Sequence, residues 1–100
     1  MNDYDLRQLT RMRQQIDSYR DGSIGLSILI GDLIFLRDAL SEVEKEWEKE
    51  FTDRIVDLES AYSYVLEKNA GKLDLITQKI VDDTIPKLLS LIEKKQTRSV

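Results

Sequence analysis

Apolar residues recur every three or four positions in four separate segments of the chain, and this spacing restricts the fold more than any other feature. An α-helix has 3.6 residues per turn, so this spacing places the apolar side chains on one face of a helix. The links between the segments are short, and no alternating apolar and polar run is long enough for a strand. Short links make consecutive helices antiparallel. The sequence therefore predicts an all-α fold, a single four-helix-type up-and-down bundle over residues 1–100.

Capping and stop signals predict where these helices begin and end. Gly22 suits the end of the first helix, because glycine readily takes the left-handed conformation that closes a helix. Ser27 is placed to cap the second helix, and Ser41 with Glu44 matches a capping box for the third. The run Asn69-Ala70-Gly71 is a stop signal for the third helix. The expected helices cover about residues 3–21, 27–40, 42–69 and 72–95.

The third and fourth segments each contain one residue with a clear structural expectation. Trp47 falls within the apolar stripe of the third segment, so we expect it to be largely buried. Pro86 interrupts the fourth segment, and a proline inside a helix removes a backbone N–H and clashes with the preceding turn. We therefore expect a kink or a split near Pro86, with Thr84 or Asp83 capping the next turn. The expected apolar stripe of this segment is Leu73, Ile76, Ile80, Leu88, Leu91 and Ile92.

The second segment is apolar on nearly all sides. Its core face is expected to consist of leucines, but Ile28, Phe35 and Ala39 project from nearly the opposite side. A helix with this pattern is either surrounded by neighbours or lies against a partner. Two interpretations stay open, a central helix packed on both sides and a contact or dimer patch centred on Phe35.

The composition excludes several classes of chemistry. The chain contains neither Cys nor His, so it lacks thiolate and imidazole metal ligands, a cysteine nucleophile and the commonest general base. It also lacks a calcium loop and the spacing of a phosphate-binding loop. We therefore expect no catalytic residues, no metal site and no cofactor.

Nucleic-acid and membrane binding are disfavoured as well. A calculated pI near 4.8 opposes direct binding to phosphate backbones. The apolar run at 24–40 contains Asp32, Arg37 and Asp38, and is shorter than the roughly 20 residues that a membrane span requires. The N-terminal residues lack the basic and apolar regions of a secretory signal, so we expect a cytoplasmic protein.

The acidity of the chain is concentrated in one helix. Residues 42–59 contain eight acidic and three basic residues, a local charge of −5 in a chain whose net charge is −4. At 100° per residue, four of these carboxylates fall within about 60° of one another beside the apolar stripe. We name Glu46, Glu50, Asp53 and Asp57 the acidic row.

We expect the acidic row to extend to Glu42 at one end and Tyr64 at the other, and Arg54 to pair with both Glu50 and Asp57. Such a surface is either a solvated face or a binding site for a basic partner. The candidate partner-binding residues are Glu42, Glu46, Glu50, Asp53, Asp57 and Tyr64.

Three short patterns resemble those of a known family. They are Tyr19-x-x-Gly22-x-Ile24-x-Leu26-Ser27, Trp47-x-x-x-Phe51 and Leu58-Glu59-x-x-Tyr62. Together they look like small helical immunity proteins of bacterial contact-dependent growth inhibition and related polymorphic toxin systems. The resemblance implies a non-enzymatic cytoplasmic protein that binds a cognate toxin domain, often a nuclease, and blocks it. It transfers no site residue, because immunity surfaces vary with the toxin.

The function expected from the sequence is therefore an immunity protein that neutralises a cognate toxin by stoichiometric occlusion. Its partner would present a basic active-site face to the acidic row. The alternative is a helical adaptor, antitoxin or chaperone that self-associates, for example as a homodimer, through Phe35 and Ile28.

Overall fold

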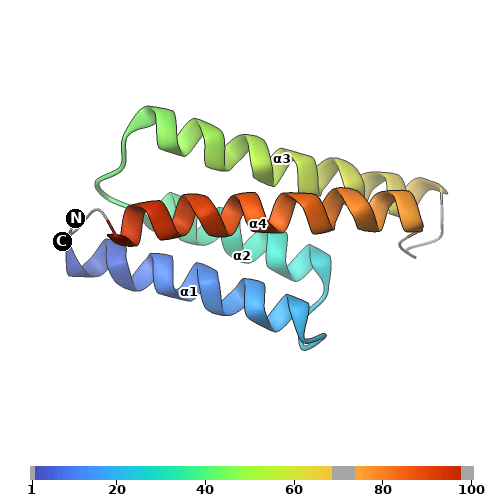
Figure 1. The fold of residues 1–100 in the computed structure, drawn as a ribbon, viewed down its shortest axis with the longest axis horizontal. Helices are drawn as coiled ribbons and strands as arrows, with labels where there is room; N and C mark the ends of the chain where they lie inside the picture. The colour runs from blue at the N-terminus through green and yellow to red at the C-terminus, as the bar shows by residue number, and fades with distance from the viewer. Residues whose placement is uncertain (1, 69–73, 98–100) are drawn as a thin grey trace.

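Four antiparallel helices make up the computed structural model, which describes residues 2–68 and 74–97 (Figure 1). Their order along the chain confirms the predicted all-α, up-and-down four-helix bundle. The helices are α1 (Asp3–Arg20), α2 (Leu26–Ala39), α3 (Lys45–Lys68) and α4 (Leu75–Thr97).

The helices are arranged as a closed ring of neighbours. Each helix packs against the one before and after it in the chain, and α1 also packs against α4. α3 and α4 have 24 and 23 residues, whereas α1 and α2 have 18 and 14. At a rise of about 1.5 Å per residue, the second pair is longer by roughly 7–15 Å. The pair α3–α4 therefore projects beyond the turn between α1 and α2, on the right of Figure 1.

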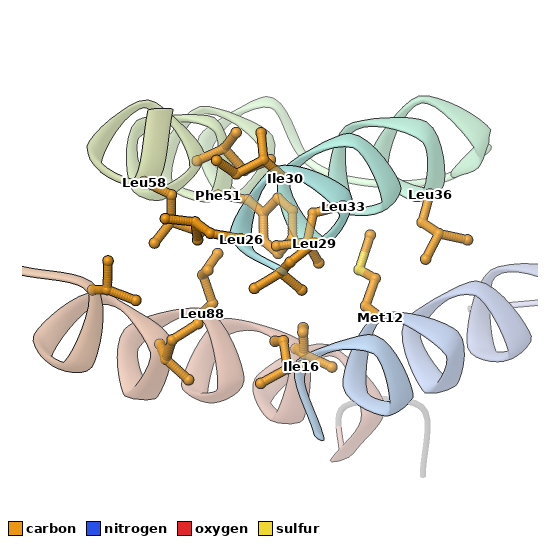
Figure 2. Close-up of a cluster of buried hydrophobic side chains, with 14 of the residues drawn as sticks. Met12, Ile16, Leu26, Leu29, Ile30, Leu33, Leu36, Phe51, Leu58 and Leu88 are labelled. Atoms are coloured by element: carbon orange, nitrogen blue, oxygen red, sulfur yellow. The ribbon is translucent and has the colours of Figure 1, made fainter. Parts of the chain in front are cut away.

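The core is formed by aliphatic side chains from all four helices, with Phe51 at its centre (Figure 2). Trp47 is 5% exposed, which confirms its predicted burial. On α2 the leucines face the core as expected, while Phe35 and Ile28 are 72% and 53% exposed. α2 is therefore not packed on both sides, and its outer apolar side chains face solvent.

The start of α2 differs from the predicted capping, whereas no cap was predicted for α1. Asn2 caps α1 by accepting a hydrogen bond at 2.8 Å from the backbone N–H of Asp5. The cap of α2 is Gly25, without a side-chain bond, and Ser27 already lies in the first turn. The prediction that Ser27 caps this helix was wrong. The helix begins one residue earlier, at Leu26, whose side chain is buried in the core.

The predicted capping box at Ser41 and Glu44 was also wrong, since α3 begins at Lys45. The carboxylate of Asp5 accepts hydrogen bonds from the backbone N–H groups of Ser41 and Glu42 at 2.9 and 2.8 Å. These N–H groups are thus bound to a side chain of α1 and are not the free N–H groups of the first turn of α3. The predicted stop at 69–71 and the start at Lys72 lie outside the described residues.

Of the two outcomes expected at Pro86, a kink or a split of the last helix, the split does not occur. α4 is a single helix with Pro86 in its interior. The expected cap at Thr84 is also absent, because the Thr84 hydroxyl donates to the carbonyl oxygen of Ile80 at 2.7 Å within the same helix. Buried residues on both sides of the proline, Ile85 and Leu88, continue one packed face and offset its cost.

The first half of the apolar face of α4 has a different phase from the one predicted, whereas Leu88 and Ile92 are buried as expected. Ile76 and Ile80 were expected in the core but are 74% and 43% exposed. Leu73 lies outside the described residues, and Leu91 is only half-buried. The buried side chains of α4 are Thr77, Val81, Thr84, Ile85, Leu88, Ile92 and Lys95.

Candidate functional site

A groove runs along the outer surface between α3 and α4, and most of the predicted site residues line one of its walls. Three hollows follow one another along this groove, with volumes of about 100, 330 and 380 Å³. The first lies between Glu46 and Lys94, and the second between Asp53 and Lys87. The third lies toward the projecting end of the pair. Its lining is Asp57, Ser60, Ala61, Tyr64, Ile76, Thr77 and Ile80.

The structure brings the whole acidic row together on the α3 wall. Each of its members lines one of the three hollows, and Tyr64 lines the third. Glu42 does not belong to this wall, because it precedes α3 and its backbone N–H is bound by Asp5. The expected extension of the row to Glu42 is therefore not formed.

Three carboxylates of the row are available to a partner. Glu46, Glu50 and Asp53 are exposed, and within residues 2–68 and 74–97 none of them makes an ion pair or a side-chain hydrogen bond. Asp57 differs, because its Oδ2 lies 3.4 Å from Nε of Arg54. In the described part of the chain, Arg54 pairs with Asp57 and not with Glu50. Only one of its two expected ion pairs is therefore found.

The opposite wall of the groove, on α4, is basic. Lys87 and Lys94 project from α4 beside the carboxylates. Neither has an ion pair with the residues that the structure describes. Their i, i+7 spacing is visible in the sequence, but only the packing of α4 against α3 places them opposite the acidic row. The groove therefore carries both signs of charge, with the negative charge on α3.

Contacts beneath the groove hold its two walls in a fixed relation. The indole N–H of Trp47 donates to the carbonyl oxygen of Leu91 at 2.9 Å, which joins α3 to α4. The rings of Trp47 and Phe51 stack with their centroids 5.0 Å apart. At the same end, buried Lys95 forms an ion pair with Glu44. A surface held in this way loses little conformational freedom when a partner binds.

Two further findings concern the chemistry of the site. The carboxylates of the described residues do not form a group of three or more that could hold a metal ion. In the same part of the chain, no helix combines the length and the apolar character that crossing a bilayer requires.

Comparisons of the chain with protein-family models, curated proteins and solved structures find no significant match. The fold and the groove define a small all-α bundle with a charged, preorganised surface. The resemblance to immunity proteins rests on the three sequence patterns alone.

Proposed function

We propose that this chain is a binding protein whose α3–α4 groove receives a basic surface of a partner protein. The observation that supports this function best is the set of three exposed carboxylates, Glu46, Glu50 and Asp53, which have no partner in the described part of the chain. Like charges in one row repel one another, and a cationic partner relieves that repulsion. The rigid junction at Trp47 keeps the row ready for contact.

The class of protein that we infer is an immunity protein of a bacterial toxin system, acting in the cytoplasm. The acidic row would occupy the basic groups with which a toxin, such as a nuclease, holds its substrate. Inhibition of this kind needs no reaction and depends on one-to-one occlusion of the toxin. Opposite charges would speed the encounter of the two proteins, and well-packed apolar contacts would slow their separation.

The test is co-expression of the tagged chain with the protein encoded by the neighbouring gene. We expect a stable one-to-one complex in size-exclusion chromatography, and loss of the neighbour's toxicity when the chain is present. A neighbouring protein that is toxic alone, and stays equally toxic and unbound beside this chain, would contradict the proposal.

A second function, self-association through α2, is favoured by the exposure of Phe35 and Ile28. Gly31 lies between them in the helix, and the space above its backbone is open, so a second surface could approach closely. Sedimentation equilibrium distinguishes this function from the first. A dimer in the wild-type chain that becomes a monomer in Phe35→Ser would support it, whereas a wild-type monomer at all concentrations would exclude it.

A further inference from the structure

The third hollow of the groove is apolar and open to solvent. We call it the apolar hollow. Tyr64 on α3 is 47% exposed, and Ile76 and Ile80 on α4 are 74% and 43% exposed. Its volume of about 380 Å³ lies within the range of about 300–1,000 Å³ that is typical of ligand pockets.

The core of the bundle does not need these side chains. On α4 the inward positions of the same turns are occupied by Thr77 and Val81, which are 2% and 0% exposed. Two isoleucines and a tyrosine are therefore left around one hollow while a threonine is buried beside them. Contiguous exposed apolar groups of this kind mark interaction surfaces more often than scattered ones do.

The apolar hollow is continuous with the acidic row. Asp57 lines the hollow and is also the last carboxylate of the row. Tyr64 is seven residues beyond Asp57, which corresponds to about 10 Å along α3. Glu46 is eleven residues before Asp57, or about 16 Å in the other direction. One partner segment about 27 Å long could therefore contact the hollow and the whole row at once.

We propose that the apolar hollow receives an aromatic or long aliphatic side chain from a basic polypeptide segment of the partner. This proposal rests on the proposed function and specifies the partner: its apolar anchor and its nearest basic group are no more than about 10 Å apart, because Asp57 lines the hollow that receives the anchor. Charge complementarity with Asp53 and Glu50, which have no ion pair in the described part of the chain, selects a basic segment over an acidic one. An apolar anchor that displaces water from the hollow slows dissociation of the complex, which exposed charge pairs do not.

The probe is a short synthetic peptide, acetyl-Trp-Gly-Gly-Arg-Gly-Gly-Arg-amide. In an extended chain, three residues span about 10 Å, so its first arginine reaches Asp57 when the indole lies in the hollow. Titration into ¹⁵N-labelled protein should shift the backbone amide signals of Tyr64, Ile76 and Ile80 together with that of Asp57. The same peptide with Ala in place of Trp should bind about tenfold more weakly, because the anchor is lost.

A matched pair of variants separates the hollow from general surface hydrophobicity. Ile76→Gln removes an apolar wall of the hollow, whereas Leu75→Gln removes a side chain that is 91% exposed and does not line it. Ile76→Gln should weaken binding of the Trp peptide about fivefold or more and leave the Ala peptide unchanged. Leu75→Gln should change neither.

Two results would overturn the proposal. One is equal binding of the Trp and Ala peptides with no effect of Ile76→Gln. The other is absence of signal shifts around the hollow at peptide concentrations of about 5 mM, well above a weak millimolar Kd. The two peptides could bind equally and yet lose binding to the double variant Glu50→Lys with Asp53→Lys. In that case the role of the acidic row is supported and only the proposed anchor site is wrong. If binding depends on Ile76 but not on these carboxylates or on salt, the basic character of the partner, and with it the proposed function, fails.

Discussion

At the scale of single residues, two buried charged side chains determine how the chain enters α3. Asp5 is 0% exposed, and its carboxylate accepts hydrogen bonds from Ser41 and Glu42. Lys95 is 4% exposed and pairs with Glu44. Buried charges are tolerated only when they are paired or well hydrogen-bonded. These two contacts therefore hold residues 41–44 against α1 and α4.

The first prediction concerns Asp5→Asn. The amide offers only one acceptor oxygen, so the part-buried backbone N–H of Ser41 or Glu42 would face an NH₂ group and lose its partner. We expect the free energy of unfolding to fall by about 1–3 kcal/mol, measured by urea denaturation. Asp3→Asn in the same turn is the control, because Asp3 is exposed and its replacement should cost no more than about 0.5 kcal/mol. Equal losses in the two variants would show that Asp5 contributes only through its charge at the helix end.

The second prediction concerns Trp47. Trp47→Ala should lower the free energy of unfolding by about 3–5 kcal/mol, because it leaves a cavity beside Phe51. Trp47→Phe keeps an aromatic ring but removes the indole N–H that donates to the carbonyl oxygen of Leu91, so we expect a smaller loss of about 1–2 kcal/mol. A denaturation midpoint of Trp47→Ala near that of the wild type would contradict the role of this residue in joining α3 to α4.

At the scale of helices, α4 shows how packing overrides a local signal. Proline in a helix interior costs about 3 kcal/mol relative to alanine, which led to the expectation of a break. The helix nevertheless continues, because Val81, Ile85, Leu88 and Ile92 form one buried face through the proline. Before the proline, the predicted stripe followed Ile76 and Ile80, whereas the buried face follows Thr77 and Val81, one position later in each turn.

The third prediction tests the energetic cost of this proline. Pro86 is exposed, so Pro86→Ala should restore a backbone N–H toward the carbonyl oxygen of Asp82 without disturbing the core. We expect the free energy of unfolding to rise by about 1–3 kcal/mol, less than the full helix-interior cost because alanine also gives the unfolded chain more freedom. The neighbouring exposed change Lys87→Ala should stay within about 0.5 kcal/mol. A less stable Pro86→Ala protein would mean that the proline imposes a geometry that the bundle requires.

Helix number, order and most of the core could be predicted because each helix carries its own periodic pattern. The start of α3 could not, since it depends on hydrogen bonds that Ser41 and Glu42 donate to Asp5, 36 and 37 residues away in the chain. The same division applies to the groove. The α3 wall follows from helical geometry alone, whereas Lys87 and Ile80 join it only through the packing of α4 against α3.

At the scale of the whole molecule, the two candidate surfaces belong to different helices. The α3–α4 groove combines the acidic row with a basic wall and an apolar hollow, whereas Phe35 and Ile28 project from α2. The two surfaces can therefore be changed independently. Lys87 and Lys94 reduce the net negative charge of the groove, so we expect it to select a partner by its charge pattern as well as by its basicity.

The most direct test of the central claim, that the acidic row receives the partner, is the rate of association with the partner protein that co-expression identifies. Three proteins are compared: the wild type, the double reversal Glu50→Lys with Asp53→Lys, and the control reversal Glu48→Lys with Glu59→Lys. The two variants have the same net charge, and all four carboxylates are exposed on α3, but only the first pair lines the groove. Melting temperatures should be similar in all three, because exposed substitutions change stability by about 0.5 kcal/mol or less.

We expect the groove reversal to associate about tenfold or more slowly than the control at about 0.01 M salt, where the Debye length is roughly 30 Å. The difference should shrink at about 1 M salt, where the Debye length is roughly 3 Å. Equal association rates of the two variants at both salt concentrations would contradict the claim, because net charge rather than the acidic row would then govern the encounter.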